Sequence, residues 1–310
     1  MLDISLTLLP IFALLVLGNL LRRNEFPGGN FWLLADKVVY WILFPALLLH
    51  STSIVKLDPV LFGDYAIILL SALIGAAIFS LVMSKIMGHT GPVAGSVFQG
   101  AVRHNTFIAF AVAEALLGPE ALVIAAVAIS VLVVPTNLLC VATLVALRKR
   151  DEGDNLSKRL LKEITKNPLL IAIAAGLTLN ASGIGPLPVI DGTTKILSHA
   201  TLPFALLCVG AGIRFKQIRL AMGAVVISVL GKFVVFAAIT IACVVALDLS
   251  GDIAMVAIIY GAIPTAASGY SLARQLGGDA TLMAGIITIE TLIAVISMPL
   301  MLAYAPLLLQ

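Results

Sequence analysis

The chain has 310 residues, of which 61% are apolar and 11% are charged, and its formal net charge is +3. Soluble proteins contain roughly half apolar and a quarter charged residues, so this composition excludes an aqueous globular fold. The apolar residues form continuous runs rather than alternating patterns, which favours membrane helices over a β-barrel. The small net charge gives no reason to expect a nucleic-acid partner.

Ten apolar runs follow one another along the chain, and we expect each to cross the lipid bilayer as a helix. The first is expected to be retained, because Met1–Ser5 lacks the basic start of a cleaved signal peptide. The predicted fold is an all-α polytopic membrane protein with ten transmembrane helices. The predicted spans are 4–22, 31–54, 64–86, 92–117, 120–147, 168–183, 194–213, 218–247, 252–276 and 280–308.

Basic residues are divided unevenly between the loops. The segment 148–167 alone contains seven lysines and arginines, whereas the loops on the opposite side contain only Lys56 and Lys195. Loops rich in lysine and arginine stay in the cytoplasm, so we expect both chain termini outside it. Apolar and basic residues recur in 148–167 at helical spacing, which predicts a cytoplasmic connector lying on the leaflet.

The two halves of the chain resemble each other. Phe44–Leu48 in the second span corresponds to Pro203–Leu207 in the seventh, and Leu117–Ala121 corresponds to Leu276–Ala280. Each half has five spans, an odd number, so the second half enters the membrane in the opposite direction. Such inverted repeats give a transporter two conformations that open to opposite sides. We predict a first repeat at 1–147, a connector at 148–167 and a second repeat at 168–310.

Polar residues interrupt the fourth and ninth spans near mid-depth. The fourth contains Gly100–Thr106, with an arginine, a histidine and an asparagine in succession, and the ninth contains Pro264. Proline lacks an N–H group and breaks a helix. We therefore expect two broken helices, whose second halves begin near 104–106 and 264–266. Their N-termini carry unpaired N–H groups and a positive dipole end, which suit an anion.

Arg103 adds a formal charge that binds a carboxylate through two parallel hydrogen bonds. An arginine inside the membrane costs about 2.5–3.5 kcal/mol, so a functional role is favoured over a simple pairing with Glu114 or Glu290. We predict a site for a small organic anion. The candidate substrate-binding residues are Arg103, His104, Asn105, Thr106, Asn137, Pro264, Thr265, Ala266 and Ser268.

Several of these residues have a structural explanation as well. Asn105 and Thr106 are suited to capping the second half-helix, and Thr265 and Ser268 to bonding their own backbone. Asn137 equally fits a hydrogen bond between helices. His104 either carries a coupling proton, since imidazole titrates near pH ~6.5, or acts as a neutral hydrogen-bonding group.

Two further charged residues lie inside spans, Lys232 in the eighth and Glu290 in the tenth. An ion pair between them would lower the cost of burying both, while snorkelling of the lysine is the alternative. With His104 they are the candidates for ion coupling.

No cofactor is expected, apart from a Na⁺ or H⁺ ion as the coupling species. The three cysteines (Cys140, Cys208 and Cys243) fall inside apolar runs without metal-ligand spacing, so no metal site is predicted. The spans contain none of the common hydrolase or metalloprotease motifs, so we do not expect an enzyme.

Three short motifs resemble the auxin efflux carrier family in its bacterial branch, whose members are related to the plant PIN proteins within the bile-acid/arsenite/riboflavin transporter superfamily. They are Arg103–Thr106 followed by Ala113–Gly118, Ala262–Ala266, and Ala273–Asp279. By this resemblance Asn105 matches the crossover asparagine of the family and Pro264 the crossover proline. The fourth span departs from the family in lacking a proline, and the long cytoplasmic loop of the large plant members is absent.

The resemblance implies an inverted five-plus-five fold with crossed, broken helices four and nine. It implies a scaffold of helices one, two, six and seven, a transport bundle of three to five and eight to ten, an elevator-type cycle and a homodimer in the bacterial inner membrane. The implied substrates are small organic anions such as dicarboxylates.

The leading hypothesis is a secondary active transporter of a small carboxylate. The alternatives are a sodium- or proton-coupled cation exchanger and a channel. Cation exchangers usually place aspartates at the helix crossing, whereas every aspartate here lies near a span end, which favours the anion carrier.

Overall fold

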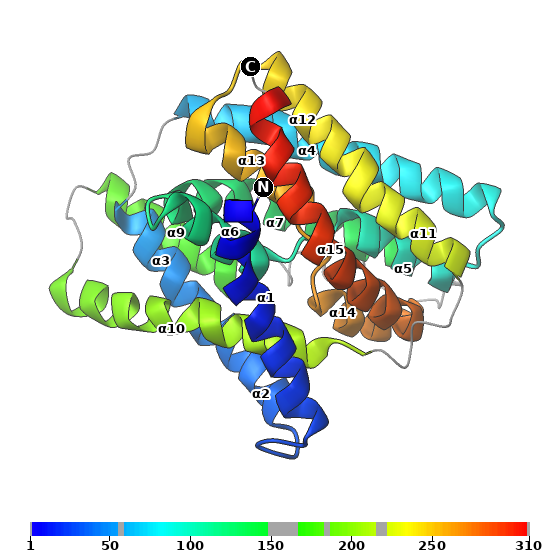
Figure 1. The fold of residues 1–310 in the computed structure, drawn as a ribbon, viewed down its shortest axis with the longest axis horizontal. Coiled ribbons are helices and arrows are strands. Elements are labelled where there is room, and N and C mark those ends of the chain that lie inside the picture. Colours follow the sequence, from blue (N-terminus) through cyan, green and yellow to red (C-terminus); the bar gives the residue numbers. More distant parts are fainter. Residues whose placement is uncertain (1, 55–58, 148–166, 183–186, 215–221, 309–310) are drawn as a thin grey trace.

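The computed structural model describes residues 2–54, 59–147, 167–182, 187–214 and 222–308. Throughout these residues the regular structure is helical, without strands (Figure 1). Except for Asn167, the predicted connector lies outside the described residues. The helices are α1 (Leu2–Arg23), α2 (Phe31–Val38), α3 (Phe44–Ile54), α4 (Pro59–Ile86), α5 (Gly91–Val102), α6 (Thr106–Leu117), α7 (Ala121–Leu147), α9 (Pro168–Ala181), α10 (Pro188–Gly212), α11 (Met222–Leu230), α12 (Ala237–Ala246), α13 (Gly251–Ala262), α14 (Ser268–Leu276) and α15 (Ala280–Leu308), with π-helical turns η1 (Val39–Leu43) and η3 (Gly231–Phe236).

Seven stretches of the described chain are long and apolar enough to cross a membrane, and α9 and α13 are shorter apolar helices. Large apolar side chains such as Leu9, Ile78 and Ile296 are exposed on them. Apolar faces of this extent suit contact with lipid. The chain is therefore a membrane protein with several crossing helices. The seven are Ile4–Arg23, Phe31–Ile54, Val60–Ile86, Ala121–Leu147, Pro188–Gly212, Met222–Ala246 and Ala280–Tyr304.

Two helices begin earlier than the hydrophobic pattern predicts. The third span was expected from residue 64 and the seventh from residue 194, but α4 begins at Pro59 and α10 at Pro188. Proline is favoured in the first helical turn, because its fixed φ angle suits the helix and its missing N–H group needs no partner there. The predicted starts omitted the first turns, each of which begins with a proline.

The two predicted interruptions are present. The fourth segment consists of α5 and α6, which are joined by the non-helical residues 103–105, and the ninth consists of α13 and α14, joined by 263–267. Arg103 is extended, with φ −79° and ψ 157°, although no proline lies nearby. Asn105 caps α6, since its side-chain oxygen accepts a hydrogen bond from the Ile108 N–H at 3.3 Å.

Close helix contacts join segments that are far apart in the sequence. α1 packs along α10, and α3 packs against both α9 and α10 (Figure 1). Glycines allow this approach: a Cβ atom on Gly18 would collide with the carbonyl of Leu207, and one on Gly210 with the carbonyl of Leu15. The amide of Asn19 also donates a hydrogen bond to the Gly210 carbonyl at 3.3 Å. Small residues let membrane helices pack backbone to backbone.

The remaining helices pack around the two breaks. α4 contacts α5, α7 and α12, while α15 contacts α5, α13 and α14. In Figure 1, α6 and α7 lie between the group formed by α1, α3, α9 and α10 and the group formed by α4, α11, α12 and α15, and α5 lies beside α11 and α15. The broken segments are thus surrounded by other helices.

Gly210→Ala is expected to lower the melting temperature of the purified protein, because overpacking costs about 1–3 kcal/mol. Gly192→Ala in the same helix is the matched control, since a Cβ atom there meets nothing within 4 Å. Replacing an exposed helical glycine by alanine normally stabilises a helix by roughly 0.5–1 kcal/mol. Equal melting temperatures for the two variants would contradict the tight α1–α10 contact.

Candidate functional site

The two broken segments contact each other where they cross. The N–H group of Asn105 donates a hydrogen bond to the carbonyl of Pro264 at 2.8 Å. The hydroxyl of Thr265 donates to the carbonyl of Gln99 at 3.3 Å. Non-helical backbone inside a membrane is tolerated only where protein groups or a water-filled cavity satisfy it. Each interruption therefore supplies partners for the polar groups of the other.

Glu290, on α15, holds the ninth-segment break from the opposite side. Its side chain is fully buried. One carboxylate oxygen accepts a hydrogen bond from the Thr265 N–H at 3.0 Å, and the other accepts one from the Ser228 hydroxyl at 2.7 Å. The carboxylate thus satisfies a backbone donor that the interrupted helix leaves without a partner.

A glycine makes room for this hydrogen-bond chain. A Cβ atom on Gly100 would collide with the hydroxyl of Ser228, which donates to Glu290. Gly100 lies on α5, one turn before the break, so α5 can approach α11 at this point. Gly100 therefore has a packing role beside the fourth-segment break.

Lys232, on η3, is fully buried. Its ammonium group lies 4.6 Å from the centre of the Phe236 ring and has no hydrogen-bond partner among the described residues. Within this part of the chain no ion pair joins it to Glu290, although the two charges interact at longer range. Of the two alternatives for Lys232, neither a direct pair with Glu290 nor snorkelling to the surface describes this buried side chain; a cation–π contact with Phe236 offsets part of the burial cost.

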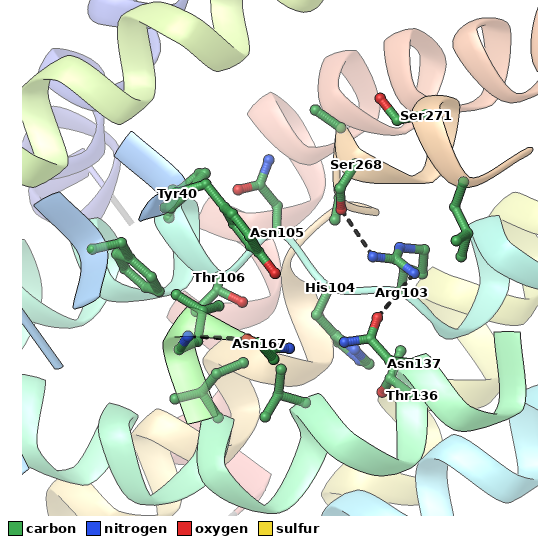
Figure 2. A pocket seen from close by; sticks show the side chains of 18 of the residues that line it. Tyr40, Arg103, His104, Asn105, Thr106, Thr136, Asn137, Asn167, Ser268 and Ser271 are labelled. Carbon is green, nitrogen blue, oxygen red and sulfur yellow. Dashed lines mark hydrogen bonds between the residues drawn. The ribbon is translucent and has the colours of Figure 1, made fainter. Parts of the chain in front are cut away.

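A cavity of about 340 Å³ lies beside the crossing (Figure 2). This volume is at the lower end of the range for small-molecule sites, roughly 300–1,000 Å³. Apolar side chains such as Phe44, Leu132 and Val209 form part of the wall. Seven of the nine predicted substrate-binding residues line it: Arg103, His104, Asn105, Thr106, Asn137, Ala266 and Ser268.

Pro264 and Thr265 lie outside the lining of this cavity. Pro264 offers its carbonyl to Asn105, and Thr265 is fully buried against Gln99 and Glu290. Both act in the crossing rather than in the cavity wall, because the extended backbone turns them toward the other broken segment.

Arg103 forms hydrogen bonds with two other predicted residues. Its guanidinium donates to the Ser268 hydroxyl at 2.9 Å and to the Asn137 side-chain oxygen at 3.3 Å (Figure 2). Both acceptors are neutral, and among the described residues neither Glu114 nor Glu290 forms an ion pair with it. Its Nε atom has no hydrogen-bond partner there. The cavity wall therefore carries a positive charge with only neutral hydrogen-bond partners.

His104 separates the cavity from the buried lysine. Its ring lies 4.6 Å from the Phe236 ring, centre to centre, and the ammonium group of Lys232 also contacts the Phe236 ring. The Nε2 atom of His104 has no hydrogen-bond partner among the described residues, and neither has the side-chain amide of the adjacent, fully buried Gln99. A polar layer with unused hydrogen-bonding capacity thus lies behind the cavity.

The start of α14 supplies backbone donors to the cavity. Ala266 and Ala267 line it and are partly exposed. In the described part of the chain their N–H groups donate no hydrogen bond. Unpaired N–H groups at a helix N-terminus, together with the dipole, attract an anion. Arg103 and this helix start face the same cavity.

Six polar lining residues were not predicted. Asp36 and Tyr40 belong to the second span, where the π-helical turn η1 shifts the helical phase. Asn167 was assigned to the connector, but it caps α9 by accepting a hydrogen bond from the Leu169 N–H at 3.0 Å. Two features of the sequence could have indicated some of them: the Asn-Pro pair at the start of the sixth span, which points to Asn167, and the polar face of 268–276, which contains Ser271 and Gln275. The six are Asp36, Tyr40, Thr136, Asn167, Ser271 and Gln275.

No group of three or more histidine, cysteine, aspartate or glutamate residues that could hold a metal ion occurs in the described parts of the chain. Cys140, Cys208 and Cys243 are free thiols. The polar chemistry of the cavity rests on arginine, histidine, amide and hydroxyl groups, together with the carboxyl group of Asp36.

Apolar helices long enough to cross a membrane, together with two interrupted segments beside an internal polar cavity, are typical of a membrane transporter. The chain belongs to the membrane transport protein family, which is the auxin efflux carrier family, since the family model matches residues 120–302. The match extends from the start of α7 into α15 and includes the ninth-segment break. A search of the curated proteins found no match. The resemblance inferred from the short motifs is confirmed at the level of the family.

Glu290→Leu is expected to lower the thermal stability of the purified protein, because it leaves the buried Thr265 N–H and the Ser228 hydroxyl without their acceptor. An unsatisfied buried donor costs about 1–3 kcal/mol. Glu290→Gln is the control, since its carbonyl oxygen can still accept from Thr265. A Leu variant as stable as the Gln variant would argue against this role of Glu290.

Proposed function

We propose that the protein is a secondary active transporter that carries a small organic anion with at least one carboxylate group. The observation that carries this proposal is the guanidinium of Arg103, which lines a cavity beside two broken helices and has only neutral hydrogen-bond partners in the described chain. A buried positive charge of this kind is stabilised when an anion binds next to it.

The neighbours of Arg103 favour a planar carboxylate. Asn137 and Ser268 orient the guanidinium, whose fork of donors matches two carboxylate oxygens. The free N–H groups at the start of α14 provide further donors on the same cavity. The remaining polar groups of the wall, including Tyr40, Thr106 and Asn167, suit hydroxyl or second carboxylate groups of a substrate.

The proposal includes a ten-segment inverted repeat that works by an elevator-type cycle. In it, α1, α2, α3, α9 and α10 form a scaffold, and the segments from α4 to α7 and from α11 to α15 form the moving bundle. The mutual packing of α1, α3, α9 and α10 supports this division. We further propose a homodimer in a bacterial inner membrane, with both termini outside the cytoplasm, as the distribution of basic residues favours.

Coupling to H⁺ or Na⁺ is assigned to the polar layer behind the cavity. His104, Lys232 and Glu290 all approach the crossing, and Glu290 contacts the ninth-segment break directly. A change in the charge of any one of them would change the electrostatic potential at the cavity and therefore the affinity for the anion.

Arg103→Ala is expected to abolish carboxylate transport, because it removes the charge that binds the substrate. Purified protein is reconstituted into liposomes, and counterflow of labelled carboxylate is measured for the wild type, Arg103→Ala and Arg103→Lys. The lysine variant keeps the charge but loses the paired geometry, so partial activity is expected. Lys85→Gln, at the exposed end of α4, is the control with full activity.

Unchanged counterflow in a folded Arg103→Ala protein would remove Arg103 from the site. Counterflow also separates the alternatives, because only a carrier is stimulated by substrate on the opposite side of the membrane. A channel would show flux without this stimulation. The acid to be used is chosen by a thermal-shift screen of mono- and dicarboxylates with and without sodium, since a ligand stabilises the folded state to which it binds.

His104→Gln is expected to flatten the pH dependence of transport, measured from about pH 5 to 8, because it removes an ionisable side chain from the polar layer behind the cavity. Glutamine keeps a hydrogen-bonding side chain but does not titrate. Initial uptake rates in liposomes across this pH range provide the measurement. A pH profile identical to that of the wild type would assign the proton to another residue or leave sodium as the coupling ion.

A further inference from the structure

A second, larger cavity of about 890 Å³ adjoins the first. Asp36, Ala267, Ser271 and Gln275 line both cavities, so the two share part of their walls. We name the larger one the vestibule. Its shared wall makes it an approach to Arg103.

Three arginines line the vestibule: Arg22 at the end of α1, Arg214 after α10 and Arg274 on α14. Arg22 donates a hydrogen bond to the carbonyl of Ala211. The guanidinium of Arg214 lies over the Tyr270 ring, 4.8 Å from its centre. Within the described parts of the chain none of the three forms an ion pair. Their partners there are a carbonyl and an aromatic ring.

The charges of the vestibule do not cancel. Glu25 and Asp36 also line it, so the described residues contribute three cationic and two anionic side chains to its lining. Arg22 and Arg214 line the same cavity from the ends of α1 and α10, so their like charges face one space. Two neighbouring cations without a bridging carboxylate are stabilised by an anion between them.

One face of α14 connects the vestibule to the inner site. Ser268 contacts Arg103, Ser271 and Gln275 line both cavities, and Arg274 lines the vestibule. Ser268 and Arg274 are six residues apart, which corresponds to about 9 Å along a helix at a rise of 1.5 Å per residue. This is close to the screening length of about 8 Å at physiological ionic strength, so an anion in the vestibule still interacts with the charge of Arg103.

We propose that the vestibule is a second anion-binding site, formed by Arg22, Arg214 and Arg274, which takes a compound with two or more negative charges. Arg214 is positioned by its contact with Tyr270. The role of this site as a first station for the transported carboxylate rests on the proposed function; the binding itself does not.

The direct test uses 1,3,6,8-pyrenetetrasulfonate, a rigid fluorescent tetra-anion, and the purified full chain in a neutral detergent. Fluorescence anisotropy at low ionic strength is expected to show binding to the wild type. Arg214→Gln and Arg274→Gln are each expected to raise Kd about fivefold or more, since one of the attractive charges is lost. High salt is expected to abolish binding.

Two variants serve as controls for the position of the dye. Lys85→Gln removes an exposed charge outside both cavities and is expected to bind as the wild type does. Arg103→Ala is expected to raise Kd less than the vestibule variants do, because Arg103 lines only the inner cavity and its charge acts on the vestibule over a longer distance. No binding to the wild type, vestibule variants with the Kd of the wild type, or a larger rise in Kd for Arg103→Ala than for the vestibule variants would each overturn the proposal.

Tyr270 provides a check on how Arg214 is held. Tyr270→Phe retains the aromatic face and is expected to preserve dye binding, whereas Tyr270→Leu removes the cation–π contact and is expected to weaken it. Equal weakening in both variants would instead assign the effect to the tyrosine hydroxyl and contradict the positioning role.

Transport kinetics then connect the vestibule to the inner site. Arg274→Gln is expected to raise KM for labelled carboxylate roughly threefold while the maximal rate stays unchanged, because weaker attraction lowers the local concentration of the anion. An unchanged KM would show that the vestibule takes no part in loading. If the wild type transports no carboxylate while the dye binds as expected, the proposed function fails and the anion site remains.

Discussion

The structure depends on how non-helical backbone is accommodated inside a membrane. Each break in α5–α6 and α13–α14 exposes N–H and carbonyl groups that hydrocarbon cannot satisfy, and each such group costs several kcal/mol when unpaired. The two breaks solve this jointly, through the hydrogen bond from the Asn105 N–H to the Pro264 carbonyl and the one from Thr265 to Gln99. Separating them would leave both segments with unpaired polar groups.

This arrangement gives the crossing two chemically different sides. On one side Glu290 and Ser228 close the ninth-segment break in a fully buried hydrogen-bond chain. On the other side Arg103 and the start of α14 face an open cavity. On the first side the fixed carboxylate of Glu290 accepts a hydrogen bond from the Thr265 N–H. On the second side the N–H groups of Ala266 and Ala267 remain available to a carboxylate that binds and leaves. The proposed site for an exchangeable anion thus lies beside the contacts that stabilise the fold.

Much of this could be predicted from the sequence, because a polar cluster or a proline inside an apolar run is costly unless it has a role. Arg103, Asn137 and Ser268 were identified separately in three spans, and the structure joins them through the guanidinium. Spacing could not show which side of a non-helical segment faces the cavity, so the positions of Pro264 and Thr265 required coordinates. The contribution of Tyr40 was hidden by a π-helical turn, which breaks the 3.6-residue periodicity used to assign faces.

The most direct test of the central claim is a cryo-electron microscopy map of the protein with the carboxylate that stabilises it most. The account predicts density for the ligand between the guanidinium of Arg103 and the N–H groups of Ala266 and Ala267, with one carboxylate within hydrogen-bonding distance of both. A ligand bound with full occupancy elsewhere, without contact to Arg103 or the start of α14, would contradict it.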